Sequence, residues 1–250
     1  MARGRVPEGH TIGRASYDAH AESLRAAYAA VPPGTRVRLA KTTSNLFRSR
    51  RGDAVGLDVA GLDAVIDVDV AARTADVGGM TTYEHLVDAT LAHGLLPLCV
   101  PQLRTITLGG AVTGLGIEAA SFRNGVPHES VVELDVLTGD GRLVTATSDP
   151  GDPHADLYAG FPNSYGSLGY ALRLRIELEE VAPYVALRHV PYSSAAAMAE
   201  AIATITTERT WRGRRVDYLD GTVFSRDEQY LTLGEYVNSP RGGVLPSDYT

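Results

Sequence analysis

The sequence predicts an α+β fold built on antiparallel strands. Two β-rich runs, 131–137 and 142–147, are joined by a Gly-Asp-Gly turn at 139–141, which is typical of a β-hairpin. Residues 170–179 alternate apolar and charged side chains with a period of two. This alternation predicts a strand with one apolar face on the core and with Arg173 and Arg175 on the outward face.

A helix is predicted between Thr81 and Gly94. Thr81 and Glu84 have the spacing of a capping box, apolar side chains recur after them at helical spacing, and Gly94 is a typical helix stop. Further helices are predicted at 18–30, 153–159 and 194–205, and further strands at 37–39, 54–59, 64–70, 74–77, 185–190, 215–219 and 229–237.

The pair Ala182-Pro183 marks a predicted domain boundary. Residues 1–182 contain enough strands and helices for one domain. Residues 183–250 supply strands and one amphipathic helix but too few partners to cover them, so we expect the beginning of a second domain that exposes apolar surface.

Composition narrows the classes of function. A net charge of −7 and a pI near 5.5 provide no basic face for nucleic acid. No secretory signal and no apolar run of membrane-spanning length occur in the sequence, so we expect a cytoplasmic protein without a membrane span. Cys99, the single cysteine, cannot form an internal disulfide, and His85 and His93 have no partners at metal-ligand spacing, so no metal site is predicted.

The most informative stretch, 95–125, is rich in glycine and poor in charge. Gly109, Gly110, Gly114 and Gly116 lie within eight positions, and glycine allows backbone N–H groups to approach a ligand closely, as in phosphate-binding loops. Tight turns between short strands are one alternative. A Rossmann fingerprint, Gly-x-Gly-x-x-Ala at 114–119 with Asp135 as the ribose-binding acid, is another, but the antiparallel hairpin that follows argues against it.

Several motifs in this stretch resemble the FAD-linked oxidoreductases of the vanillyl-alcohol oxidase type. These motifs are Pro101, Thr-Leu-Gly-Gly at 107–110, Gly-Leu-Gly-Ile-Glu-Ala-Ala-Ser at 114–121, and Gly125. Within that superfamily, the combination is most similar to the Δ24-sterol reductase (24-dehydrocholesterol reductase-like) branch, and the similarity continues through 133–141, 156–159 and 166–169. The resemblance implies a PCMH-type, two-subdomain FAD-binding domain at 1–182 and the start of a cap or substrate domain at 183–250.

The resemblance also implies which residues bind FAD. They are Thr42, Thr43, Ser44, Asn45, Thr107, Leu108, Gly109, Gly110, Thr113, Gly114, Gly116, Ile117, Glu118, Ser121 and Gly169. The loop 42–45 lacks the usual glycines of the family and fits an ordinary polar turn equally well. The loop 166–169 also fits a hairpin-like connection, and Glu118 is expected to shape the glycine loop or contact the cofactor.

The function implied by the resemblance is that of an FAD-dependent oxidoreductase acting on a small, lipid-like substrate, with reduced nicotinamide nucleotide as a candidate partner. Two alternatives remain: a flavin oxidase of the same fold acting on a sugar or alcohol, similar to decaprenylphosphoryl-ribose oxidases, and a flavin-binding fragment without turnover. No catalytic acid or base is assigned. We expect non-covalent FAD, because 41–47 and 101–125 contain neither His nor Cys; Cys99 and His128 lie outside these loops.

Overall fold

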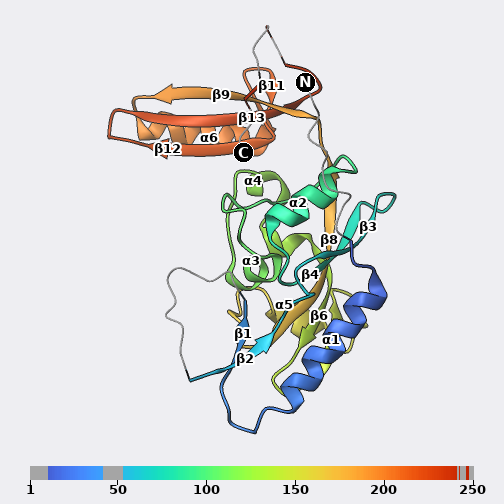
Figure 1. The fold of residues 1–250 in the computed structure, drawn as a ribbon. Coiled ribbons are helices and arrows are strands. Elements are labelled where there is room, and N and C mark those ends of the chain that lie inside the picture. The colour runs from blue at the N-terminus through green and yellow to red at the C-terminus, as the bar shows by residue number, and fades with distance from the viewer. Residues whose placement is uncertain (1–10, 42–52, 241, 243–245, 248–250) are drawn as a thin grey trace.

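The computed structural model describes residues 11–41, 53–240, 242 and 246–247, which form two bodies, each with its own sheet (Figure 1). The helices are α1 (Arg14–Ala29), α2 (Tyr83–Leu91), α3 (Leu108–Gly114), α4 (Ser121–Asn124), the 3₁₀ helix η1 (Pro127–Ser130), α5 (Ala155–Gly160) and α6 (Ala195–Glu208). The strands are β1 (Val37–Ala40), β2 (Val55–Asp58), β3 (Val65–Asp69), β4 (Thr74–Gly78), β5 (Leu95–Pro97), β6 (Val131–Leu137), β7 (Leu143–Thr147), β8 (Tyr170–Glu180), β9 (Tyr184–Tyr192), β10 (Thr210–Trp211), β11 (Arg214–Arg215), β12 (Tyr218–Val223) and β13 (Gln229–Val237). The predicted α+β class is confirmed.

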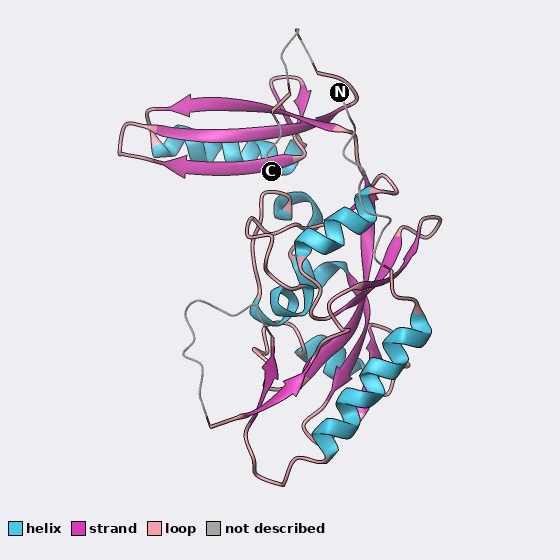
Figure 2. Ribbon diagram, viewed as in Figure 1, coloured by secondary structure: helices cyan, strands magenta, loops and turns pink. Residues whose placement is uncertain are grey.

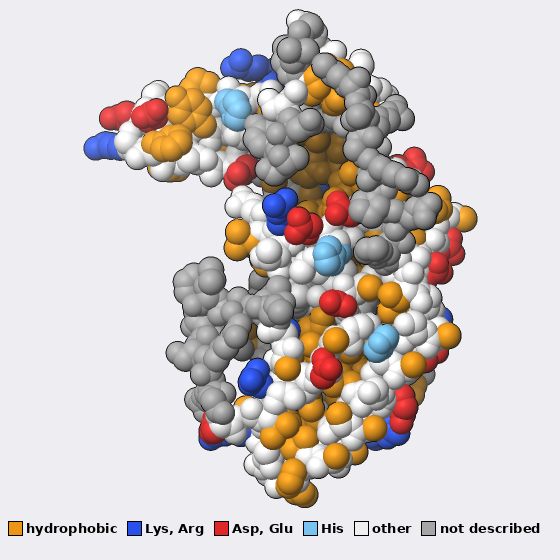
Figure 3. All heavy atoms as spheres, in the orientation of Figure 1, with side chains coloured by type: hydrophobic (Ala, Val, Ile, Leu, Met, Phe, Trp, Pro, Cys, Tyr) orange, Lys and Arg blue, Asp and Glu red, His pale blue; other side chains and the backbone are white. Residues whose placement is uncertain are grey.

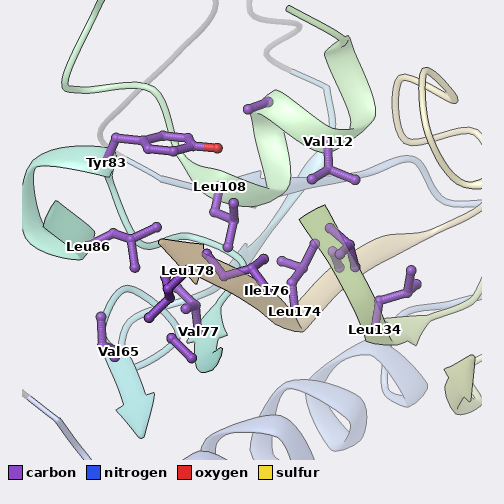
Figure 4. Close-up of a cluster of buried hydrophobic side chains, with 14 of the residues drawn as sticks. Val65, Val77, Tyr83, Leu86, Leu108, Val112, Leu134, Leu174, Ile176 and Leu178 are labelled. Atoms are coloured by element: carbon purple, nitrogen blue, oxygen red, sulfur yellow. The ribbon is translucent and has the colours of Figure 1, made fainter. Parts of the chain in front are cut away.

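The larger body is organised around β8, the central strand of an antiparallel sheet with the order β3-β4-β8-β6-β7, to which β5 adds beside β8. The predicted hairpin is confirmed as β6–β7. Helix α1 covers one face of the sheet, and α2 and α3 cover the other (Figure 2). Tyr83, Leu86 and Leu108 from these two helices belong to one buried cluster with Leu174 and Ile176 of β8 (Figure 4). Burial of these apolar side chains fixes α3, and hence the glycine stretch, on the sheet.

The outward position predicted for Arg173 is wrong, because α1 covers the face of the sheet on which Arg173 lies. β8 also contains a bulge next to this residue. Asp135 of β6 pairs with Arg173, whereas the next residue, Val136, pairs with Ala171, so Leu172 is an extra residue in β8. A bulge places two consecutive side chains on the same face of the sheet. Leu172 and Arg173 therefore both point toward α1, and the period of two is broken at this point.

Arg173 instead lies at the centre of a buried charge cluster, with its side chain only 1% exposed. It donates two hydrogen bonds of 2.8 Å to Asp135 and is also paired with Asp76 and Glu133. Tyr17 of α1 donates a further hydrogen bond of 2.8 Å to Asp135. Since buried charges are tolerated only when they are paired, this cluster ties α1, β4, β6 and β8 into one arrangement.

The stability of the protein should fall in acid because of this cluster. Burial alone would raise the pKa of Asp135, but the hydrogen bonds and charge of Arg173 outweigh burial and hold this pKa below its usual value, which is about 3.9. A carboxylate with a lowered folded-state pKa contributes stability above its unfolded-state pKa, and this stability is lost as the pH falls through the folded-state pKa. We expect the free energy of unfolding in urea to decrease below about pH 4, and Asp135→Asn to reduce that pH dependence. An unchanged pH dependence in Asp135→Asn would contradict this assignment.

The predicted capping box of Thr81 and Glu84 is wrong, because the helix is capped one residue later and has His85 rather than a glutamate at the third position. Thr82 is the N-cap of α2, and its Oγ1 accepts a hydrogen bond of 3.3 Å from the amide of His85. Thr81 is fully buried, and its carbonyl accepts a hydrogen bond of 2.9 Å from the amide of Leu108. The turn before α2 is thereby tied to the start of α3.

The smaller body is an antiparallel sheet with the order β12-β13-β9, with α6 packed on one face. Its core consists of Met198, Ala201, Ile205, Val216, Leu231 and Leu233. Alternation along β9 places Val185 and Leu187 on the opposite face, where both are exposed, and Figure 3 shows hydrophobic side chains over this sheet. The turn between β8 and β9 coincides with the predicted boundary at 182–183, and the division into domains stays a prediction.

Candidate FAD-binding site

The first glycines of the stretch lie in the first turn of α3. The amide groups of this turn donate hydrogen bonds to other backbone groups of the protein. The amide of Leu108 donates to the Thr81 carbonyl and that of Gly109 to the Gly79 carbonyl, each at 2.9 Å. A Cβ added to Gly109 would lie 2.7 Å from the Gly79 oxygen. Gly109 is therefore required by the close approach of two backbone segments.

The next residues complete a helix cap. Thr107 Oγ1 accepts a hydrogen bond of 3.3 Å from the amide of Gly110, and a Cβ on Gly110 would lie 2.9 Å from this oxygen. Thr113 Oγ1 donates a hydrogen bond of 2.7 Å to the carbonyl of Gly109. The first half of the glycine stretch is thus a packing and capping motif, and contacts of Thr107–Thr113 with FAD stay a prediction.

The second half of the stretch is open. Among the described residues, nothing lies within 4 Å of a Cβ built on Gly114, and a Cβ on Gly116 would have Glu118 Oε1 alone at 3.9 Å. The side chains of Leu115 and Ile117 are 45% and 81% exposed. Within the described residues, no backbone carbonyl accepts from the amides of 115–117. Within the described part of the chain, this segment thus combines N–H groups that have no backbone acceptor with uncovered glycine surface.

Leu115 has a strained backbone. Its φ is 61° and its ψ is 148°, a conformation that residues other than glycine rarely adopt. Strain of this kind costs on the order of 1–3 kcal/mol and is concentrated at ligand-binding and active sites. The protein maintains it at the open turn between Gly114 and Gly116, where the sequence predicts the cofactor.

Beyond the open turn, Glu118 and Ser121 shape the loop. Ser121 Oγ accepts a hydrogen bond of 2.9 Å from the amide of Glu118, and Glu118 accepts one of 3.3 Å from the amide of Gln102. Burial raises the pKa of Glu118, the bond from Gln102 opposes that rise, and the charge of Asp220 adds to it. These contacts support the predicted loop-shaping role of Glu118.

Cys99 and His128 lie beside the loop. Cys99 is 2% exposed, and its Sγ is 3.5 Å from Ser121 Oγ. Burial raises the pKa of the Cys99 thiol, although its hydrogen bond with Ser121 acts in the opposite direction. A buried, protonated thiol is a poor nucleophile. His128 lies in η1, and its Nδ1 is buried with no partner among the described atoms.

Gly169 allows the start of β8 to pack closely against β6. Its φ is 136°, and an added Cβ would lie 2.4 Å from the carbonyl oxygen of Leu137 in β6. The preceding loop contacts the end of α3 through the amide of Tyr165, which donates 3.0 Å to the Thr113 carbonyl. The close contact of Gly169 is thus with protein backbone, in line with the alternative of a strand connection, and its contact with FAD stays a prediction.

The structure brings together only part of the predicted site. The residues 107–121 form one continuous feature, whereas Thr42, Thr43, Ser44 and Asn45 lie outside the described residues. The Rossmann alternative is wrong, because Asp135 is held in the buried cluster and both neighbours of β6 are antiparallel. Leu115 was missed by the sequence analysis, since only its position between two glycines marks it.

The backbone of 114–117 fits the diphosphate of FAD. Free N–H groups and uncovered glycines at 114–117 match the needs of an anionic, closely approaching group. The exposed Leu115 and Ile117 add apolar surface beside them. In the described ranges, no cluster of His, Cys, Asp or Glu side chains could hold a metal ion, and no helix is long and apolar enough to cross a membrane.

Comparison with known proteins identifies the family of this chain. Residues 14–147 match the family model described as an FAD binding domain. Cytokinin dehydrogenase 2 of Oryza sativa subsp. japonica is 31% identical over 68% of this chain and 32% of its own length. Delta(24)-sterol reductases of Arabidopsis thaliana and Pisum sativum are 27% and 24% identical, over 70% and 73% of this chain and 31% and 33% of their own lengths.

The chain spans about a third of the length of these relatives. The family match covers more than half of the chain and includes α1, the glycine stretch and the β6–β7 hairpin. The resemblance to flavin-linked oxidoreductases of the vanillyl-alcohol oxidase type is confirmed. The chain belongs to the FAD binding domain family.

Proposed function

We propose that this chain is the cofactor-binding part of an FAD-dependent oxidoreductase and that it holds FAD through the open turn 114–117. The strained Leu115 between two uncovered glycines is the observation that carries the proposal. Gly114, Gly116 and Ile117 would lie against the diphosphate, with Thr113, Glu118 and Ser121 fixing the shape of the turn. Bound FAD would supply reversible transfer of two electrons, while the protein supplies orientation and exclusion of water.

The attachment is proposed to be non-covalent. Cys99 is buried and protonated, and Nδ1 of His128 is also buried, so neither group is presented for covalent attachment. We expect the purified protein to show flavin absorption bands, and acid precipitation to leave yellow FAD in the supernatant. A yellow pellet would contradict non-covalent binding, and a colourless protein without affinity for added FAD would contradict the proposed function itself.

The substrate is proposed to be lipid-like, as the names of the sterol reductases among the relatives suggest. A second candidate is oxidation of a cytokinin, because cytokinin dehydrogenases match at the higher identity of 31%. The two proposed activities differ in the molecule that donates electrons to the flavin. Bleaching of the flavin bands by reduced nicotinamide nucleotide supports the reductase, whereas bleaching by a cytokinin in its absence supports the dehydrogenase.

A further inference from the structure

The segment that follows the open turn is held by the smaller body at several points. The carbonyl of Ala119 accepts a hydrogen bond of 2.9 Å from the amide of Leu219 at the start of β12. Phe122 of α4 packs against the hydrophobic core of the smaller body. Arg209 donates to the Phe122 carbonyl, and its guanidinium carbon lies 5.0 Å from the centre of the Phe122 ring.

Arg123 is the polar centre of this contact. It forms a two-pronged ion pair with Glu179 at the end of β8, with N–O distances of 2.6 and 2.8 Å and both side chains 17% exposed. Its Nε donates 3.3 Å to the carbonyl of Asp217 in the smaller body. One guanidinium thus joins α4, the central strand of the larger body and the smaller body, a geometry that lysine cannot reproduce.

The partners of Arg123 are themselves fixed. Asp217 is fully buried, and its carboxylate accepts from Arg215 at 2.6 Å and from the amide of Tyr236 at 2.9 Å. Glu179 also accepts 3.0 Å from the side-chain amide of Asn124. Hydrogen bonding of Glu179 and burial act in opposite directions on the pKa of Arg123, and the net effect is a rise, which keeps the guanidinium charged.

We propose that Arg123 is a positioning residue that couples docking of the smaller body to the shape of the turn 114–117, and thereby sets the affinity for FAD. The last of the free N–H groups of that turn, on Ile117, lies four residues before Ser121, the first residue of α4. Release of α4 frees the downstream end of the turn, so the strained Leu115 relaxes and the binding surface is lost. The smaller body thus acts on cofactor affinity without contributing an atom to the open turn. This inference rests on the proposed binding of FAD at that turn.

The test uses the full chain with Arg123→Lys, which keeps the positive charge and removes the two-pronged hydrogen bonding to Glu179. Arg73→Lys is the matched control, because Arg73 pairs with the neighbouring Glu180 at 3.9 Å on the exposed surface. FAD titration should show a dissociation constant raised about tenfold or more for Arg123→Lys and unchanged for Arg73→Lys. In the FAD-free protein, amide hydrogen exchange at 115–121 should accelerate, while exchange in β4 and β8 stays at the wild-type rate.

Arg209→Gln provides an independent test from the smaller body. It should accelerate exchange at 115–121 in the same way, and its effect should be less than additive with Arg123→Lys because both act through α4. The inference would be overturned if amide exchange at 115–121 in folded Arg123→Lys kept the wild-type rate. It would also be overturned if Arg73→Lys accelerated this exchange as much as Arg123→Lys does. Failure of the wild-type chain to bind FAD would instead contradict the proposed function, and the exchange rates would still decide whether Arg123 holds the turn.

Discussion

Arg173→Ala is expected to lower the free energy of unfolding by about 3–5 kcal/mol, a large fraction of the stability of an ordinary domain. The change leaves Asp135, Asp76 and Glu133 without the cation that all three contact. Asp135 is 3% exposed at its side chain and cannot regain water without breaking the sheet or releasing α1. Urea denaturation monitored by circular dichroism measures the loss.

Arg175→Ala is the matched control on the same strand. Its side chain is 41% exposed and contacts Asp76 alone within the cluster, so solvent screens its charge and its removal should have a much smaller effect. Equal losses in the two variants, or a loss below about 1 kcal/mol for Arg173→Ala, would show that the cluster does not hold α1 on the sheet.

The fold could be predicted from the sequence where local pattern decides the structure. The Gly-Asp-Gly turn, the alternation in 170–179 and the helix stop at Gly94 each depend on residues within a few positions of one another. The resulting hairpin, strand and helix are found as β6–β7, β8 and α2. Composition also singles out the glycine stretch, because no other part of the sequence combines so many glycines with so little charge, and its contact with FAD stays a prediction.

The remaining features depend on contacts between distant residues. The bulge at Leu172 arises from the pairing of β8 with β6, and it brings Leu172 onto the face of Arg173 although the local alternation gives no sign of it. Arg123 meets Glu179 and Asp217 across 56 and 94 positions of sequence. Nothing in the composition of 119–124 indicates these partners, so the link between the two bodies became visible only in the folded chain.

The glycine stretch shows the same division, since its glycines look alike in sequence and differ in the structure. Gly109 and Gly169 face backbone carbonyls at 2.7 and 2.4 Å, so a side chain at either would disrupt packing before any ligand is involved. Gly110 lies against the capping oxygen of Thr107, which makes Gly110→Val an ambiguous test of binding. Gly116 is uncovered, and only there and at Gly114 does the loop combine a missing side chain with open space.

Gly116→Val is therefore expected to raise the FAD dissociation constant by about 100-fold or more, equivalent to about 2.7 kcal/mol, while leaving the FAD-free protein as stable as the wild type. A branched side chain at this position meets no backbone atom of the described residues and would project into the space where the cofactor is proposed to approach. Fluorescence titration with FAD measures the affinity, and thermal unfolding without FAD measures the stability. Gly139→Val is the control, because an added Cβ on Gly139 likewise meets no backbone atom of the described residues within 4 Å but lies in the β6–β7 turn. Full FAD stoichiometry in folded Gly116→Val would show that FAD does not bind at the open turn, because a valine there would place a branched side chain against the diphosphate.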